Sequence, residues 1–391
     1  MKITTFSIVS GGSACNARCP FCVARMTPDN GVGTKEPEVN WRNFRKACLL
    51  ARQSNVTTVL VTGKGEPTLF PNQITSYLER LQEFEFPMIE MQTNGICIAD
   101  GKVTEEHLQR WYDLGMTTIA ISIVSYDPAK NHQIYLPYRK RVVPAPQQKP
   151  VGDGRPGTLA QVSPGWYEQG LTRASDGSLV PHDPAGSAPR SVADDEPDTL
   201  PSARFPGGEP PRAPSRLPLL SDQPSLGKEL SERASRESSG YIDLPALIAK
   251  LHKPERRFSV RLSCILANGF IDSASELQNL LAFARENGVE QMTLIPVTKP
   301  NDSKDLEAFE WISQHHVRDE QWAEIRDFVE RAGRKLMTLP HGAVIYDVGG
   351  QNLNLSNCLT VDADGEQIRT LIFFPDGHAR YDWAHEGAIL F

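Results

Sequence analysis

Residues 4–22 read TTFSIVSGGSACNARCPFC, and this stretch sets the pattern for the rest of the chain. The apolar run from Thr4 to Val9 predicts a buried β-strand, which Ser10-Gly11-Gly12 would end in a turn. Three cysteines, Cys15, Cys19 and Cys22, follow within eight residues. Further along, short apolar runs alternate with segments of helical periodicity, which favours an α/β fold with parallel strands.

Six strand–helix repeats can be followed along the chain. Strands are predicted over residues 4–9, 57–62, 88–92, 117–124, 258–266 and 291–297. Helices are predicted over residues 40–54, 71–84, 104–114, 241–252, 273–287 and 319–334. Beyond them a β-rich tail contains a predicted hairpin, whose strands 370–374 and 379–383 flank an Asp-Gly turn.

A segment in the middle of the chain breaks this pattern. Sixteen of the 30 prolines lie between Pro144 and Pro224, interleaved with Gly, Ser, Asp and Arg. Such a composition buries too little apolar surface to offset the entropy of an ordered chain, so residues 139–239 are predicted to be a disordered insertion. The remaining chain divides into a first part of the fold, 1–138, a second part, 240–298, and a C-terminal helix and β-rich tail, 299–391, expected to cap the substrate.

The overall composition excludes several classes of protein. With 391 residues and a net charge of −7, the chain gives no sign of a broad nucleic-acid-binding surface. The sequence contains no run of about 18 apolar residues, so no membrane span is predicted. The N-terminus lacks the apolar segment of a secretory signal, and seven cysteines, three of them clustered, do not form the pattern of a secreted disulfide framework. We therefore expect an intracellular, cytoplasmic protein with reduced cysteines.

The cysteine spacing carries the strongest chemical signal. Thiolates spaced C-x3-C-x2-C can hold three corners of a cubane iron–sulfur cluster and leave its fourth iron without a protein ligand. That open iron can chelate the amino and carboxylate groups of S-adenosylmethionine (SAM). The alternatives are a structural zinc site or unrelated reduced cysteines. A zinc site normally has four ligands in paired C-x2-C spacing, and no second cysteine pair exists here. Cys15, Cys19 and Cys22 are therefore the predicted metal ligands.

The motif directly follows a first strand and carries Phe21 before its third cysteine, so it resembles the signature of the radical SAM superfamily. The resemblance covers roughly residues 4–136 and 240–298 and implies a partial (β/α)6, TIM-like barrel. It also implies a [4Fe–4S] cluster at which SAM is reductively cleaved to a 5′-deoxyadenosyl radical, which abstracts hydrogen from a substrate. An electron donor such as flavodoxin or ferredoxin is implied as a partner, and Phe21 would lie near the adenine of SAM.

A second stretch agrees with this resemblance. Gly63-Lys64-Gly65-Glu66-Pro67 follows the second predicted strand and is similar to the superfamily's Gly-Gly-Glu stretch, which receives the methionine amino group of SAM. Lys64, between the glycines, departs from that pattern. By resemblance, Gly63, Gly65 and Glu66 bind SAM, and the glycines let the backbone approach a ligand closely. An ordinary strand-to-helix turn is the alternative.

Other strand ends supply further candidates by resemblance. Thr93 and Asn94 end the third strand and Ser122 lies on the fourth, where the superfamily binds the methionine and ribose of SAM. Asn268 ends the fifth strand, in a stretch that would border the adenine. Ordinary strand or turn roles are the alternative for each. Cys358, in the tail, is a candidate catalytic residue, as a hydrogen donor or attachment point, with buried packing as its alternative.

These motifs do not identify the substrate, which is a small molecule or a peptide. We expect it to bind near the tail from Leu339 onward, where the tail packs against the open side of the barrel. Two alternative functions are a radical SAM activase or maturase of a partner protein and an RNA methylase-like enzyme. A third, from another class, is a non-catalytic zinc- or cluster-binding module. Cys48, Cys97 and Cys264 are predicted to pack in the core.

Overall fold

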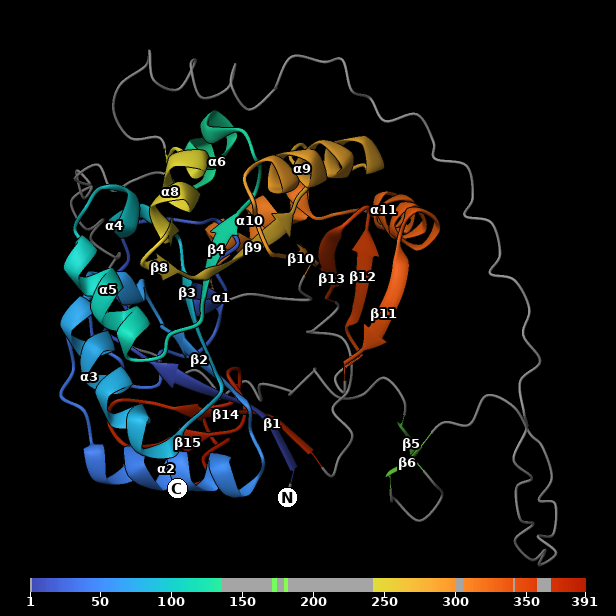
Figure 1. Ribbon diagram of the computed structural model, residues 1–391. Coiled ribbons are helices and arrows are strands. Elements are labelled where there is room, and N and C mark those ends of the chain that lie inside the picture. The colour runs from blue at the N-terminus through green and yellow to red at the C-terminus, as the bar shows by residue number, and fades with distance from the viewer. Residues whose placement is uncertain are drawn as a thin grey trace, which may run out of the picture. The chain divides into compact units, whose positions relative to one another are not determined.

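The computed structural model describes residues 2–135, 171–173, 179–181, 242–299, 305–339, 342–356 and 367–391 (Figure 1). The chain divides into two compact units, one made of Met1–Arg141 with Ser221–Phe391 and the other of Val142–Leu220. In the second unit, the described residues form a short antiparallel pair, β5 (Leu171–Arg173) with β6 (Leu179–Pro181). The rest of the predicted insertion, 139–239, lies outside the described residues, and its boundaries stay a prediction.

A mixed sheet organises the first unit. Its strand order is β11-β12-β13-β10-β9-β4-β3-β2-β1-β14-β15. Eight neighbouring strands run parallel: β1 (Lys2–Val9), β2 (Thr58–Thr62), β3 (Met88–Thr93), β4 (Thr118–Ile123), β9 (Ser259–Leu266), β10 (Gln291–Pro296), β13 (Gln351–Leu355) and β14 (Gln367–Phe373). The edges are antiparallel: β11 (Arg334–Thr338), β12 (Val344–Val348) and β15 (Ala379–Arg380). The α/β fold with parallel strands predicted from the sequence is confirmed.

The six predicted strands are all present and form the centre of this sheet, while the tail supplies its flanks. Strand β14 pairs with β1 on one side, and β13 pairs with β10 on the other. The tail therefore completes the sheet, in addition to any capping role expected of it. The predicted Asp-Gly hairpin is confirmed as β14–β15, closed by a hydrogen bond from the Gly377 N–H to the Phe374 carbonyl. In Figure 1 the sheet curves strongly, and it is open because β11 and β15 form its two edges.

Helices cover one face of the sheet and bury its apolar residues. The longer helices are α2 (Trp41–Gln53), α3 (Pro71–Leu81), α5 (Glu105–Asp113), α6 (Pro128–Tyr135), α8 (Leu244–Leu251), α9 (Ala274–Glu286), α10 (Leu306–His315) and α11 (Asp319–Ala332). The short elements are α1 (Val23–Met26), α4 (Ile96–Ala99), the 3-10 turns Pro67–Leu69 and Gln82–Phe84, and the pair β7 (His252–Lys253) with β8 (Arg256–Arg257). Helix α10 was not predicted from the sequence. None of the helices in the described ranges has both the length and the apolar character of a membrane span.

Side-chain caps explain why several helices begin where the sequence predicted. Asn40 accepts a hydrogen bond from the N–H of Asn43 at the start of α2, and Ser273 caps α9 in the same way. Such caps satisfy backbone N–H groups that have no partner inside the helix. Helix α8 starts at Leu244 and not at Tyr241, because the side chain of Asp243 caps it.

Alternation along the strands separates an apolar face from a polar one. On β9, Val260, Leu262, Cys264 and Leu266 are buried in the core that the helices cover. The residues between them point to the opposite side, as pleating requires. We call that side the polar face; it carries Glu90, Gln92, Ser122, Arg261, Ser263, Gln291, Thr293 and Asn354. Cys48 and Cys264 are fully buried, so their predicted core packing is confirmed.

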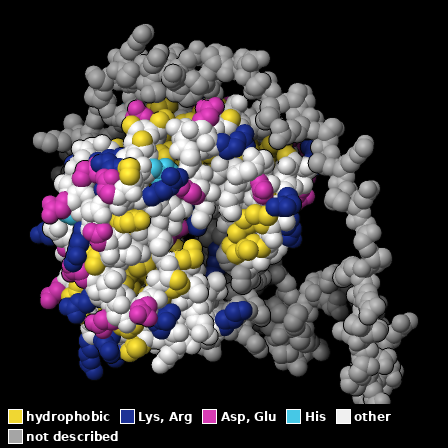
Figure 2. All heavy atoms as spheres, viewed as in Figure 1, with side chains coloured by type: hydrophobic (Ala, Val, Ile, Leu, Met, Phe, Trp, Pro, Cys, Tyr) yellow, Lys and Arg dark blue, Asp and Glu magenta, His cyan; other side chains and the backbone are white. Residues whose placement is uncertain are grey.

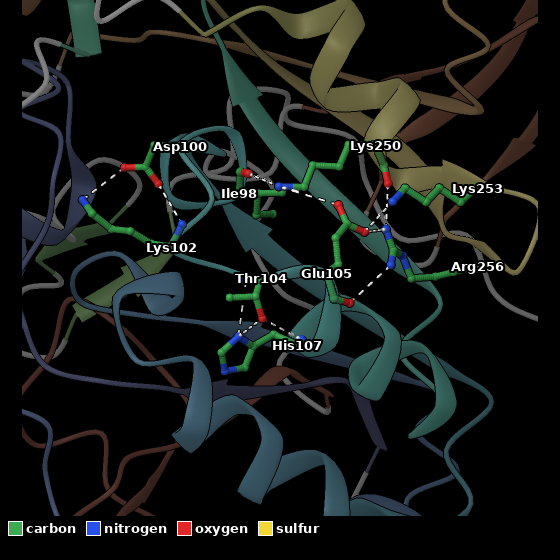
Figure 3. Close-up of polar contacts among 9 residues, drawn as sticks. All are labelled: Ile98, Asp100, Lys102, Thr104, Glu105, His107, Lys250, Lys253 and Arg256. Carbon is green, nitrogen blue, oxygen red and sulfur yellow. Dashed lines mark hydrogen bonds and ion pairs between the residues drawn. The ribbon is translucent and has the colours of Figure 1, made fainter.

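Charged side chains join the residues before the predicted insertion to those after it (Figure 3). Glu105, at the start of α5, lies 2.7 Å from Lys253 and 2.8 Å from Arg256. Arg256 is buried and also donates to the carbonyl of Lys250, while the ammonium of Lys250 donates to the Ile98 carbonyl. Hydrogen bonds from Lys253 and Arg256 lower the pKa of Glu105 against the opposing effect of desolvation.

Replacing Glu105 with glutamine is expected to lower the free energy of unfolding by about 1–2 kcal/mol. The loss arises because the buried Arg256 guanidinium keeps its burial but loses its anionic partner. Urea unfolding followed by circular dichroism measures the effect. The control is the exposed residue Glu106, next to Glu105. The free energy of unfolding of Glu106→Gln should stay within about 0.5 kcal/mol of that of the wild type. Equal stabilities for the two variants would contradict this role of Glu105.

Candidate functional site

The three motif cysteines lie on the loop between β1 and α1. The loop folds back on itself, since the N–H of Cys22 donates to the carbonyl of Cys19 and the N–H of Ala17 donates to Cys15 Sγ. All three thiols are free and partly buried. Burial raises the pKa of the Cys15 thiol to about 12 and that of Cys19 still further, and the neighbouring thiols add to both effects. Three thiolates this close together need a strongly cationic partner to be stable.

The surroundings of the loop fit an iron–sulfur cluster. The hydroxyl of Tyr135 is buried and has no hydrogen-bond partner among the described residues; burial raises its pKa, and the nearby Cys19 raises it further. Thiolates and sulfides of a cluster are acceptors that such an O–H can use. Among the described residues, no three His, Cys, Asp or Glu side chains surround a point suited to one metal ion. Cysteines that bind different irons of a cubane stand farther apart than the ligands of a single ion.

The turn after β2 is pressed against the cysteine loop. The N–H of Glu66 donates to the carbonyl of Ala14, the residue before Cys15, at 2.9 Å. A Cβ on Gly65 would overlap that carbonyl, and a Cβ on Gly63 would lie 3.0 Å from the carbonyl of Ser10. The glycines were predicted to let the backbone approach SAM; in the structure the backbone that they admit is that of the cysteine loop. Their contact with SAM stays a prediction.

The carboxylate of Glu66 is buried and accepts hydrogen bonds from several nearby residues. Its Oε1 accepts from the N–H and Oγ1 of Thr68 and from Oγ1 of Thr93, while its Oε2 accepts from the N–H of Asn94. Burial raises the pKa of Glu66, and these hydrogen bonds from Thr68, Thr93 and Asn94 oppose the rise. Oε2 has a single donor among the described residues, so it keeps acceptor capacity for a further cation.

Asn94 connects this carboxylate to the cysteine loop. Its backbone N–H binds Glu66, while its Nδ2 donates to Asn16 Oδ1 at 2.8 Å and points at Cys15 Sγ at 3.9 Å. Asn16 in turn donates to Cys97 Sγ at 3.2 Å. Cys97 is fully buried, as predicted, but it packs beside the site and not only in the core. Sequence reasoning missed Asn16 and Cys97; the amide inside the cysteine motif was the available signal for Asn16.

Lys64, the residue that departs from the superfamily pattern, is also buried beside the loop. Its ammonium donates to Thr27 Oγ1 at 2.7 Å and lies 5.9 Å from the ring centre of Trp383. Burial lowers the pKa of Lys64, whereas the nearby charges of Cys22 and Asp29 raise it. A cation therefore stands next to the third motif cysteine, which the sequence alone did not predict.

Helix α10 and the residue before it also contact the cysteine loop and α1. The rings of Phe21 and Trp311 are 5.6 Å apart, and Arg25 pairs with Asp305 at 2.6 Å and with Glu307 at 3.3 Å. Phe21 is thus placed by α10, and its predicted position near an adenine stays a prediction.

The remaining candidates make other contacts among the described residues. Ser122 lies on the polar face, level with Ser263 of the next strand. Asn268 accepts from Gln321 of α11 and donates its N–H to the carbonyl of His315. The structure therefore brings Thr93 and Asn94 to the cysteine loop and shows no described contact of Ser122 or Asn268 with it. Cys358 lies outside the described residues.

Comparisons with known proteins agree with this site. Residues 9–148 match the Radical SAM superfamily model. The curated GTP 3′,8-cyclase of Aeromonas hydrophila subsp. hydrophila is 28% identical over 123 residues, 31% of this chain and 34% of that relative. The match thus spans about a third of the relative's length.

Two solved structures show weak likeness. Native anSMEcpe with bound AdoMet has a TM-score of 0.44 at 10% identity, covering 98% of this chain and 76% of that chain. BtrN in complex with AdoMet and 2-DOIA has a TM-score of 0.23 at 19% identity, covering 31% of this chain and 47% of that chain.

The family match begins at the end of β1 and runs through the cysteine loop, the turn at Glu66 and strands β3 and β4. That is the part of the chain in which Asn94 contacts both Glu66 and the cysteine loop. Residues 9–148 are thus identified as a radical SAM domain, and the enzymes of that superfamily use a [4Fe–4S] cluster and S-adenosylmethionine.

Proposed function

We propose that the chain reductively cleaves SAM and uses the resulting radical to remove a hydrogen atom from a substrate. The observation that carries the proposal is the contact of Asn94 with both Cys15 and Glu66, which joins the predicted cluster ligands to a buried carboxylate. In the proposed architecture, the curved sheet is the partial (β/α)6 barrel of the superfamily, to which the tail adds the parallel strands β13 and β14 and the antiparallel strands β11, β12 and β15.

Cys15, Cys19 and Cys22 would hold the cluster. The bound cluster would supply one-electron reduction of SAM, with the electron drawn from a flavodoxin- or ferredoxin-type donor; cleavage would give methionine and a 5′-deoxyadenosyl radical, which would become 5′-deoxyadenosine by taking one hydrogen atom from the substrate. Residues of this chain position the reactants. Glu66 Oε2 would accept the methionine ammonium, because it is buried and has acceptor capacity left. Thr93 and Thr68 hold the other oxygen and so fix the direction of the carboxylate.

The curated relative is a GTP cyclase, but its match covers a third of its length, so GTP enters as one candidate substrate to be assayed. A peptide, a partner protein or an RNA are the other candidates. For the electron donor and the substrate, only the chemical class is proposed.

Replacing Glu66 with glutamine is expected to weaken SAM binding by about 10- to 100-fold, since a charge-assisted hydrogen bond contributes about 1.5–3 kcal/mol. The amide also presents N–H donors where Thr68, Thr93 and Asn94 already donate. Equilibrium dialysis of anaerobically reconstituted protein measures SAM affinity, and chromatography measures 5′-deoxyadenosine.

The control is Glu83→Gln, which changes an exposed carboxylate paired with Arg45 away from the site. This variant should match the wild type in both measurements. Wild-type SAM affinity and 5′-deoxyadenosine formation in Glu66→Gln would refute the role of Glu66. Absence of 5′-deoxyadenosine from reconstituted wild-type protein under a strong reductant would count against the proposed reaction.

A further inference from the structure

The polar face is unusual for a parallel sheet, whose enclosed side is commonly packed with branched apolar residues. Parallel pairing places Gln92, Ala120, Arg261 and Gln291 in one row across β3, β4, β9 and β10. Paired residues of neighbouring strands point to the same side, so these side chains share one surface. Figure 2 shows the described part hollowed between the region of β1–β4 and the region of β11–β13.

Arg261 is the centre of this surface. Its Nη1 lies 2.6 Å from Glu90 Oε2, and its Nε and Nη2 donate to Gln291 Oε1 at 3.0 and 2.6 Å. Glu90 belongs to β3, two strands away, and Arg261 can reach it because the strand between them carries the small Ala120 in that row. These bonds use three of the five guanidinium N–H donors and leave two.

The two charges of the pair are not equally accessible. The side chain of Arg261 is 26% exposed, whereas that of Glu90 is 5% exposed. A molecule that reaches the polar face therefore meets the cation and its two unused donors, while the carboxylate stays behind it. Asn354, on β13, adds a buried Oδ1 without a partner among the described residues, which a donor group of a ligand can satisfy.

A purely structural role explains this arrangement less well. Replacing a buried ion pair with apolar residues is often neutral or stabilising, so a pair of this kind contributes little to folding. An arginine held in a fixed orientation by a carboxylate and an amide is, in contrast, well prepared to bind a carboxylate or phosphate through its free donors.

We propose that Arg261, oriented by Glu90 and Gln291, binds an anionic group of the substrate, either a carboxylate or a phosphate. The proposal rests on the proposed function for what happens to the bound molecule, but anion binding itself requires no SAM cleavage. We expect a substrate of this class also to carry hydrogen-bonding groups, because hydroxyl side chains such as Ser263 and Thr293 line the surface next to Arg261.

Anion binding is measured with inorganic phosphate and with acetate as probes, on cluster-loaded protein without SAM, by the shift of thermal unfolding at constant ionic strength. The wild type should be stabilised by at least one probe, and the preferred probe distinguishes a phosphate from a carboxylate. Arg261→Gln should lose at least four-fifths of that shift. Arg257→Gln is the matched control, because Arg257 is a 68% exposed arginine of the same segment, and it should retain the shift.

Glu90→Gln gives a second, independent readout. Removing the carboxylate while keeping its shape leaves Arg261 without its anionic partner, so phosphate or acetate should bind several-fold more tightly than to the wild type. A merely structural ion pair predicts no such gain. Equal shifts in wild type and Arg261→Gln, or a Glu90→Gln variant that binds anions no better than the wild type, would overturn the proposal. If the wild type binds these anions but forms no 5′-deoxyadenosine, the proposed reaction is contradicted and the anion site is not.

Discussion

Replacing Cys19 with alanine is expected to reduce the iron content of anaerobically reconstituted protein from about four atoms per chain to below about one. Cys19 is the central thiol of the loop, and the charges of Cys15 and Cys22 both act on it. With one of the three thiolate ligands removed, a second iron of the cluster would have no protein ligand, and the cluster would dissociate more easily. Colorimetric iron and sulfide analysis, together with the visible absorption of the cluster, measures the outcome.

Cys48→Ala is the matched control, because Cys48 is a free cysteine buried in α2 that belongs to the hydrophobic core. It should keep its iron even where its stability falls. Four irons retained in a variant with all three loop cysteines changed to alanine would show that the cluster is held elsewhere. Stoichiometric zinc in place of iron after reconstitution would favour the binding-module alternative.

Replacing Gly65 with alanine is expected to have the second largest effect, with iron content and SAM binding both reduced several-fold. The added Cβ would overlap the carbonyl of Ala14 and come within 2.7 Å of the carbonyl carbon of Ser13, and both neighbours are backbone that no side-chain rotation can relieve. Overpacking of this kind costs about 1–3 kcal/mol, and here the segment that must move carries Cys15. Iron analysis and equilibrium dialysis with SAM measure the change.

Gly33→Ala provides the control for this substitution. Gly33, which lies between α1 and α2, accepts a hydrogen bond from the N–H of Ser13 on the cysteine loop, yet a Cβ at Gly33 would meet no atom within 4 Å. Its iron content should match that of the wild type. Wild-type iron content in Gly65→Ala would mean that the turn after β2 does not position the cysteine loop.

Much of the fold could be predicted because buried parallel strands appear in a sequence as short apolar runs. The six predicted strands agree with β1, β2, β3, β4, β9 and β10 to within a residue or two at most ends. Strand β13 was not predicted, because alternating residues such as those of Gln351–Leu355 fit many partners until pairing with β10 fixes their register. The hairpin strand at 370–374 was predicted, but its pairing with β1 was not. Helix α10 was missed because it follows residues 298–304, where the apolar pattern gives no helical period.

The sequence by itself determined the spacing of the three motif cysteines, the turn that carries Glu66 and the positions of the central strands along the chain, because each depends on residues close together in the chain. Only the tertiary structure decided what surrounds them. Asn16 meets Cys97 across 81 positions, Arg25 meets Glu307 across 282, and Arg261 reaches Glu90 over the strand that carries Ala120. Such contacts arise where strands from distant segments pair side by side, and their geometry is set by register and curvature of the sheet, which no local pattern specifies.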